Sequence, residues 1–326
     1  MRISAPPVVR TASLLFAMLV AGCARAGRPF VAPERALESR IYASGARAYV
    51  SFEAMMRSVS RADVVFFGEQ HDDPATHRAE LSVLAALGNG PRPVVLSLEM
   101  FERDVQGVLD DYLAGRITEA DFLAHSRPWE RYTTDYRALV ELARARGWPV
   151  VASNVPRRLA SVVSRKGLAV LDTMSAGDRA LVARDISCPR DAYYTNFAEQ
   201  MKGHSAGEGP ASAADSAAMR AMTDRFYEAQ CIKDETMAES IVAALSRAGE
   251  GAVVLHVDGA FHSDYGLGTA ARVARRRPGV ARTILTAIPV ESLAAAKPDS
   301  DAARADFVIV TRKPPAAPVV PATSKP

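Results

Sequence analysis

The sequence is poor in cysteine, and its one pronounced N-terminal apolar run is short. Among 326 residues there are three cysteines, so beyond Cys23 only Cys188 and Cys231 are left to form an internal disulfide. In an oxidising compartment an isolated pair favours a disulfide, and two unrelated thiols are the alternative. The apolar stretch over residues 14–21 is too short for a stable membrane span.

Dense basic clusters are also missing. The formal net charge is +3, and basic runs such as residues 275–277 are short and have no aromatic residues between them. A nucleic-acid partner is therefore not expected. Hydrophobic residues make up 48% of the chain and charged residues 24%, values near those of globular domains, so most of the chain can bury a core.

Residues 1–22 have the pattern of a bacterial lipoprotein signal peptide. Two arginines precede the apolar stretch, and the sequence VAGC that ends at Cys23 is typical of a lipobox, in which the cysteine becomes the lipidated N-terminus. A plain cleaved signal peptide is the alternative. Because Ala24 follows the cysteine, we expect a membrane-anchored lipoprotein of the outer membrane that faces the periplasm, with residues 23–33 as its tether.

Short apolar runs alternate with helical patterns at both ends of the remaining chain. Helices are predicted over residues 74–87, 137–146 and 266–277. The alternation predicts one α/β domain over residues 34–312, with a mainly parallel central sheet flanked by helices. Strands are predicted where β-branched or aromatic runs are bounded by breakers, at residues 64–67, 94–98, 150–152, 253–257, 283–289 and 307–310.

Nearly a hundred residues of helical pattern separate the third and fourth predicted strands. We expect residues from about 156 to 248 to form a helical lid subdomain, inserted between strands and placed beside the carboxyl edge of the sheet. Its Tyr, Phe and Met side chains can face a flat apolar ligand, although packing within the lid is the ordinary explanation for any one of them. Residues 313–326 are rich in Pro and Ala, which predicts a disordered tail.

Polar side chains of ligand type follow four of the apolar runs. The pattern Gly-x-x-His occurs twice, ending at His71 after the first predicted strand and at His262 after the fourth. Glu99 follows the second strand and Asn154 the third. Because ligands bind at the carboxyl ends of strands in open α/β sheets, these residues are expected to form one site.

His71, Glu99 and His262 are the strongest candidates in this group. Glu99 stands in a wholly apolar context, so its carboxylate must be either neutral, with a raised pKa, or paired with a metal or a histidine. Two imidazoles and a carboxylate predict a divalent-metal triad or a general acid/base set, and a structural hydrogen-bond cluster is the alternative. Further candidates nearby are Glu69, Gln70 and His77.

The segments FFGEQHDDPATHRAEL, LSLEMFERDVQGVLDDYLAG, RPWERYTTDYRALVELAR, VVASNVPRRLA, KDETMAESI and HVDGAFHSDYGLG show a family resemblance. They resemble the ChaN family of haem-binding uptake lipoproteins, within the Tiki/TraB/erythromycin-esterase-like grouping. The resemblance extends from about residue 52 to 309 and implies an α/β domain. Tiki-like relatives are metal-dependent hydrolases, and their paired histidines and glutamate match His71, His262 and Glu99, with Zn, Mn or Co as the implied metals.

The same resemblance implies a role in haem or iron acquisition. A family member can bind haem between two protomers through a tyrosine ligand, so a ligand-linked homodimer and an outer-membrane uptake machinery are implied partners. For this chain the two hypotheses are haem binding and, alternatively, metal-dependent hydrolysis of an ester or peptide bond. Candidate haem contacts are Tyr132, Tyr193 and Tyr194 as iron ligands and Arg131 for a propionate.

Overall fold

The computed structural model describes residues 39–204 and 213–313, together with Met1. Apart from Met1, the predicted signal peptide lies outside these residues, as do Cys23, the tether and almost all of the predicted tail. None of the helices in the described part of the chain has both the length and the apolar character needed to cross a membrane.

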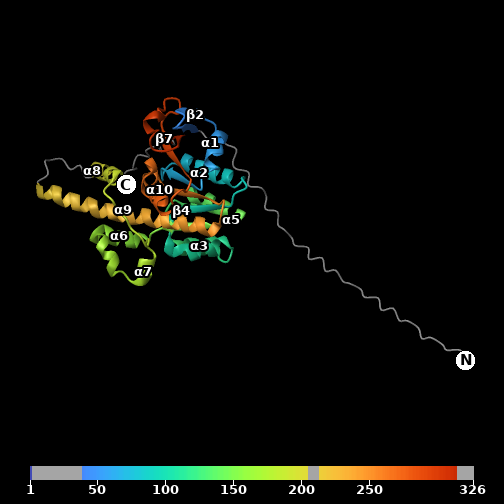
Figure 1. Cartoon of the computed structure of the whole chain (residues 1–326), viewed down its shortest axis with the longest axis horizontal. Coiled ribbons are helices and arrows are strands. Elements are labelled where there is room, and N and C mark those ends of the chain that lie inside the picture. The colour runs from blue at the N-terminus through green and yellow to red at the C-terminus, as the bar shows by residue number, and fades with distance from the viewer. Residues whose placement is uncertain (2–38, 205–212, 314–326) are drawn as a thin grey trace, which may run out of the picture. The chain divides into compact units, whose positions relative to one another are not determined.

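The core of the fold is an eight-stranded mixed sheet with the order β2-β1-β8-β7-β3-β6-β4-β5. Figure 1 shows the sheet surrounded by helices. The pairs from β8 to β5 are all parallel, whereas β1 pairs antiparallel with β2 and with β8. The predicted α/β class with a mainly parallel sheet is confirmed, and the hairpin β1–β2 is an addition to it. The strands are β1 Ser39–Ala43, β2 Ala48–Val50, β3 Val64–Glu69, β4 Val94–Glu102, β5 Val150–Asn154, β6 Val253–Gly259, β7 Arg282–Val290 and β8 Phe307–Arg312.

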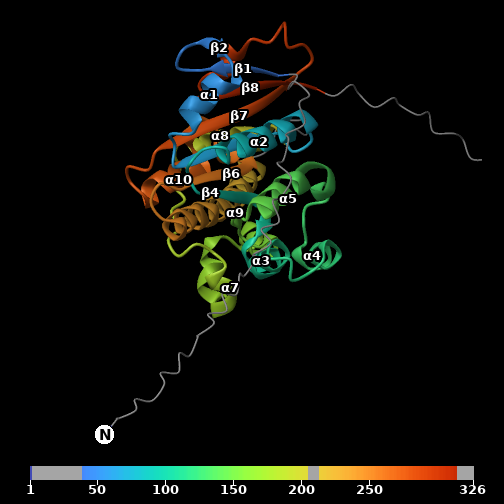
Figure 2. The same ribbon diagram turned by 90° about the vertical axis from the view of Figure 1, so that its right-hand side faces the viewer.

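Helices cover both faces of the sheet (Figure 2). Successive residues of a strand point to opposite faces, so in β3 Val65 and Phe67 pack with α1, α2 and α5, whereas Val64 and Phe66 pack with α9 and α10. The helices are α1 Phe52–Val59, α2 Pro74–Leu87, α3 Gln106–Leu113, α4 Glu119–Ser126, α5 Arg137–Arg146, α6 Arg157–Lys166, α7 Ala176–Ala180, α8 Ala192–His204, α9 Ala213–Ala248 and α10 Gly268–Arg276.

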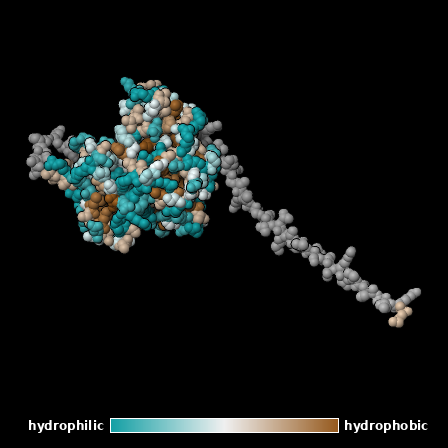
Figure 3. Space-filling model, in the orientation of Figure 1, coloured by the Kyte–Doolittle hydropathy of each residue, from teal (hydrophilic) through white to brown (hydrophobic). Residues whose placement is uncertain are grey.

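The helical insertion between β5 and β6 consists of α6, α7, α8 and α9. It is not a separate lid throughout, because the second half of α9 packs on the sheet through Ala238, Ile241, Ala244 and Leu245. The first part of the insertion has its own small core around Val163 and Ile232. In Figure 3 apolar side chains also gather on the surface over α6 and α7, beside this core.

Candidate functional site

Three adjacent parallel strands bring the predicted site residues to one edge of the sheet. The order β3-β6-β4 places the segment that carries His71 next to the segment that carries His262, with Glu99 on the other side. β4 continues to Glu102, beyond its predicted end at residue 98. Its pairing with β6 does end at Leu98, so Glu99 is the first residue that leaves this ladder and is free to turn its carboxylate into the site.

His262 and Glu99 form a buried ion pair, in which Nε2 of His262 lies 3.3 Å from Oε1 of Glu99. The other ring nitrogen, Nδ1, lies 2.7 Å from Oδ1 of Asp234 in α9. Burial alone would lower the pKa of His262, but the charges of Glu99 and Asp234 raise it to about 10. The imidazole is therefore held as a cation between two carboxylates.

Glu99 is stabilised as an anion in this arrangement. Burial would raise its pKa, but the positive charge of His262 outweighs burial, and Lys233 and a backbone N–H add to the effect, so the pKa lies far below its usual value. The backbone donor is the N–H of Gly259, 2.8 Å from Oε2 of Glu99. The expected alternative of a neutral, desolvated Glu99 therefore does not apply.

His71 stands at the surface of the same site, with its side chain half exposed. Its Nδ1 contacts Oε1 of Glu69, the last residue of β3, and this hydrogen bond raises the pKa of His71 while burial opposes the rise. The ring lies over the backbone of Gly259, where a Cβ atom would come within 2.9 Å of Nε2 of His71 and 3.7 Å of Oε2 of Glu99. The glycine of the second Gly-x-x-His motif thus makes room for the histidine of the first.

A pocket of about 610 Å³ opens above these residues. His71 and His262 form part of its floor, and α8 contributes one wall through Tyr193, Asn196 and Glu199. A volume of this size falls within the range of small-molecule sites. The remaining lining residues are Glu69, Gln70, Gln200, Gly259, Ala260, Phe261, Asp264, Tyr265, Leu267 and Arg304.

Of the expected haem contacts, Tyr193 is the one that lines this pocket. Its ring is buried and stacks on Phe261 with centroids 4.9 Å apart, and its hydroxyl donates to Oδ2 of Asp234 at 2.8 Å. Burial raises the pKa of Tyr193 well above its usual value, and the charge of Asp234 adds to this effect. Gln230 donates to the same hydroxyl from α9 at 3.2 Å.

The other expected haem contacts lie elsewhere. Tyr132 is buried among aromatic side chains, including Phe101 and Phe122. Tyr194 donates to Oδ1 of Asp224 at 2.8 Å. Arg131 binds Asp135, with Nε 2.5 Å from Oδ2. These three side chains do not line the pocket that contains His71 and His262.

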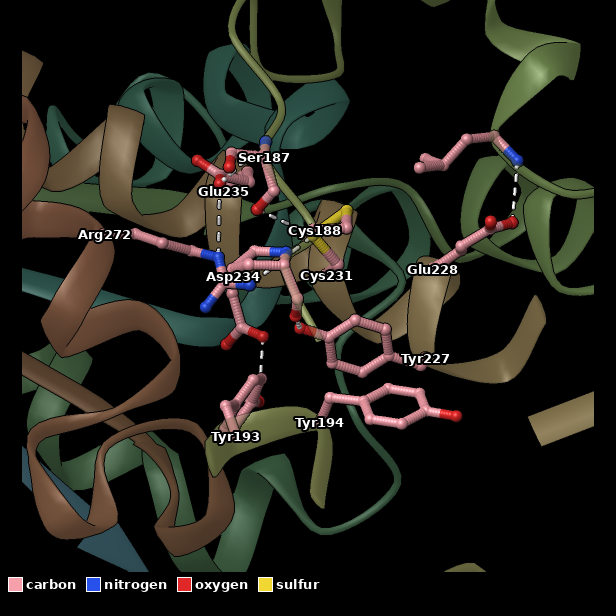
Figure 4. Close-up of a disulfide and its surroundings, with 12 residues drawn as sticks. Ser187, Cys188, Tyr193, Tyr194, Tyr227, Glu228, Cys231, Asp234, Glu235 and Arg272 are labelled. Atoms are coloured by element: carbon pink, nitrogen blue, oxygen red, sulfur yellow. Dashed lines mark hydrogen bonds and ion pairs between the residues drawn. A yellow bond between two sulfur atoms is a disulfide. The ribbon is translucent and has the colours of Figure 1, made fainter. Parts of the chain in front are cut away.

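Cys188 and Cys231, the pair expected from the sequence, are joined by a disulfide with an S–S distance of 2.05 Å (Figure 4). Cys188 lies just before α8 and Cys231 lies in α9, next to Gln230. The bond therefore fixes the start of the pocket wall to the helix that supplies Asp234.

Sequence reasoning missed three residues that complete the site: Asp234, Gln230 and Tyr265. Asp234 lies in a 36-residue helix with many acidic residues, so only its contacts distinguish it from its neighbours. Tyr265 is 52% exposed at the pocket and has a left-handed backbone with φ of 62°. A large exposed side chain and a strained backbone are signals of a functional position, but neither can be read from the sequence.

The donor set of the site suits more than one chemistry. His71, Glu99 and His262 offer two imidazoles and one carboxylate, a donor set that suits a divalent metal, but they are not a group among the described residues whose donor atoms all lie within 4.8 Å of one another. Asp234 orients His262 through Nδ1, in the way that carboxylates also orient histidines that bind metals. Tyr265 adds an exposed phenol to the lining of the same pocket.

Comparisons with known proteins agree with this architecture. A family model described as haem-binding uptake, Tiki superfamily, ChaN matches residues 55–273. A solved structure described as cofacial haem binding to ChaN of Campylobacter jejuni has a TM-score of 0.62 and 16% identity, covering 83% of this chain and 96% of that chain. A mutant of the erythromycin esterase EreC in its open conformation has a TM-score of 0.44 and 13% identity, covering 80% of this chain and 79% of that chain. No curated protein matches.

Proposed function

The chain belongs to the haem-binding uptake ChaN family of the Tiki superfamily, and on this basis we propose that it binds haem or a related iron compound during iron uptake. Family membership is the observation that carries the proposal. The pocket above His71 and His262 is the proposed ligand site, because it combines a suitable volume with an apolar wall formed by Phe261 and Leu267.

An iron ligand must be a Tyr, His, Met or Cys side chain that the iron can reach. In the pocket, Tyr265 meets this requirement best because its side chain is exposed. The hydroxyl of Tyr193 already donates to Asp234, and His71 is engaged with Glu69 through Nδ1. We therefore assign Tyr265 as the first candidate for the axial ligand and keep Tyr193 as the second.

The pocket also contains a cationic side chain, Arg304, that can pair with a haem propionate. Arg304 lines the pocket and binds Asp264 next to Tyr265, with Nη2 2.6 Å from Oδ2. Guanidinium groups form strong charge-assisted pairs with carboxylates, so Arg304 suits this role better than Arg131, which lies outside the pocket.

Titration of the purified full-length chain with haemin, followed by the Soret band, tests the proposal. Tyr265→Phe is expected to weaken binding at least about tenfold, equivalent to about 1.4 kcal/mol, and to change the ligand-sensitive absorption. Tyr49→Phe is the matched control, because Tyr49 is also exposed but lies on β2. Tyr193→Phe and Tyr194→Phe extend the series. The absence of a saturable haemin complex with the wild-type chain would refute the proposal.

A lipid anchor at Cys23 is part of the proposed function. The disulfide between Cys188 and Cys231 suits an oxidising compartment such as the periplasm, which supports export of the chain. Labelling of cells with a radioactive fatty acid tests the anchor: the wild-type chain should be labelled and should fractionate with the outer membrane, whereas Cys23→Ala should lose both properties. An unlabelled wild-type chain would contradict it.

A homodimer linked by the ligand is the third part of the proposal. A flat ligand held at an exposed tyrosine leaves one face open to a second copy of the chain, and binding then shifts the equilibrium toward the dimer. Light scattering after size exclusion should show a monomer without haemin and a dimer with it. The hydrolase alternative for His71, Glu99 and His262 stays a prediction, since no feature of the described residues favours it over haem binding.

A further inference from the structure

A second cluster of ionisable side chains lies beneath His71, between β3 and α2. Glu69, His77, Glu80 and Asp135 are all at least 95% buried. Arg131 reaches Asp135 from the surface. Among the ion pairs of the described residues, Glu69 and Glu80 have only histidines as partners. Two buried carboxylates without a full set of cations are costly, which raises the question of what neutralises them.

The ring of His77 has its two nitrogens in different surroundings. Nε2 lies 3.3 Å from the carbonyl oxygen of His71 and 3.4 Å from Oδ2 of Asp135. A carbonyl oxygen can only accept a hydrogen bond, so Nε2 carries the proton in the tautomer that satisfies this contact. In the neutral ring Nδ1 then presents a lone pair, and it faces Oε2 of Glu69 at 3.4 Å and Oε2 of Glu80 at 3.2 Å.

Three electron-pair donors thus converge on one point, namely Nδ1 of His77, Oε2 of Glu69 and Oε2 of Glu80. Of these three atoms, Oε2 of Glu69 is buried without a hydrogen-bond partner, and Oε1, the other oxygen of Glu80, is also unpartnered. One proton can be shared by only two of these three donors. A divalent cation at the point of convergence would satisfy both carboxylates and the imidazole at once.

We propose that Glu69, His77 and Glu80 form a binding site for a divalent transition-metal ion of the zinc or manganese type. Within the described residues, these three form the one group of potential ligands whose donor atoms all lie within 4.8 Å of one another. Metal–ligand bonds of about 2.0–2.1 Å in a tetrahedral site place neighbouring ligand atoms about 3.3 Å apart. The separations of 3.4 and 3.2 Å around Nδ1 of His77 match that spacing.

The surroundings of His77 support the assignment independently. Histidines that bind metals almost always donate their second ring N–H to a carbonyl or carboxylate, and Nε2 of His77 has one of each. The ion would also act on the pocket. It binds Oε2 of Glu69, while Oε1 of the same carboxylate holds His71 and accepts from the hydroxyl of Tyr136 at 2.7 Å. The metal therefore orients His71 through Glu69, and the site does not depend on haem binding.

Calorimetric titration of the chelator-stripped full-length chain with Zn²⁺ and Mn²⁺ tests the site. The wild-type chain is expected to bind one ion at this site. Glu80→Gln should lower the affinity for that ion at least about 100-fold, and Asp135→Asn should lower it about 10–100-fold. Glu99→Gln makes the same chemical change at the other candidate metal site and should leave this ion in place. Circular dichroism establishes that each variant is folded.

Three results would overturn the proposal. The first is a wild-type chain that binds neither ion. The second is binding that survives in Glu80→Gln but is lost in Glu99→Gln, because the ion then belongs to the site of His262. The third applies if Glu80→Gln does not fold, when wild-type crystals soaked in Zn²⁺ are measured by anomalous scattering instead. The expected result is a peak among Glu69, His77 and Glu80. A peak at another place and none here contradicts the assignment.

Discussion

The Nε2 atom of His262 lies 3.3 Å from the Oε1 atom of Glu99, and both side chains are buried at the junction of β6 and β4. Removal of one partner leaves a buried charge without compensation, which typically costs about 3–5 kcal/mol. His262→Gln is therefore expected to lower the free energy of unfolding by about this amount in urea at pH 7. His125→Gln, at an exposed histidine in α4, is the control and should change it by less than about 0.5 kcal/mol.

The same ion pair predicts how stability depends on pH. The pKa of His262 is about 10 in the folded chain and about 6.5 when unfolded, so its contribution is complete below about pH 6.5 and is lost as the pH rises toward 10. Glu99 has a lowered pKa, so its contribution is lost only as the pH falls below about 4.5. Wild-type unfolding free energy should fall between pH 7 and 10, and the fall should be smaller in His262→Gln. Parallel curves for the two proteins would contradict the assignment of the charge to His262.

Gly259→Ala tests the contact between the two Gly-x-x-His motifs. The backbone of Gly259, with φ of −58° and ψ of 135°, accepts alanine without strain, so the effect is steric. The added Cβ would meet the ring of His71 at 2.9 Å. Because His71 is half exposed, its ring is expected to rotate away from Glu69, and its pKa should fall toward the ordinary value in an NMR titration. Gly45→Ala is the control, since no atom lies within 4 Å of the added Cβ, and an unchanged pKa in Gly259→Ala would refute the contact.

The disulfide is expected to stabilise both the fold and the pocket wall. Cys188 and Cys231 are 43 residues apart, and closure of a loop of this length contributes about 4 kcal/mol in the chain-entropy account. The double variant Cys188→Ala/Cys231→Ala should lose about that amount of unfolding free energy and should bind haemin more weakly, because the start of α8 is released. A reductant should lower the melting temperature of the wild-type chain but not that of the variant. Equal sensitivity of the two proteins would contradict a stabilising disulfide.

The sheet and the ends of several helices could be predicted because their signals are local. The apolar runs predicted the strands β3 to β8. Local signals also mark helix ends, since α2 begins at Pro74 after the Asp73 cap. At the other end, α5 stops before Gly147, which has a left-handed backbone conformation. The hairpin β1–β2 was missed because it is short and β2 is largely exposed, so its pattern does not stand out. The second half of α9 was assigned to a lid because helical periodicity does not reveal which neighbour a buried face contacts.

Some residues of the candidate site could also be predicted from the sequence, and others could not. His71, Glu99 and His262 could be grouped from the sequence because each follows a strand, and parallel strands bring their carboxyl ends to one edge. His77 could be named only as a nearby candidate, and Asp234 could not be identified, since both lie within helices and obtain their roles from contacts across the fold. Tyr132, Tyr194 and Tyr265 are all tyrosines, so residue type could not distinguish them as candidate haem contacts. Burial and the lining of the pocket distinguish them in the structure.

Asp234 is predicted to stabilise the positive charge of His262 while it also accepts a hydrogen bond from Tyr193. Its carboxylate accepts hydrogen bonds from Nδ1 of His262 at 2.7 Å, from the hydroxyl of Thr269 at 2.9 Å and from the hydroxyl of Tyr193 at 2.8 Å. In Asp234→Asn the amide oxygen can still accept from His262, and the amide N–H can donate to the phenol oxygen, so the variant removes the charge and retains the shape. We expect the pKa of His262 to fall and the unfolding free energy to drop by about 1–3 kcal/mol.

Asp224→Asn is the matched control for this change. Asp224 lies on the same helix and accepts from the hydroxyl of Tyr194 at 2.8 Å, but it is partly exposed and pairs with Arg190 instead of a histidine. Its replacement should cost less than about 1 kcal/mol, because exposed ion pairs contribute little, and it should leave the pKa of His262 unchanged. If NMR titration gives the same pKa for His262 in Asp234→Asn as in the wild-type chain, Glu99 alone holds the imidazolium. Asp234 would then act only as a hydrogen-bond acceptor for Tyr193 and Thr269.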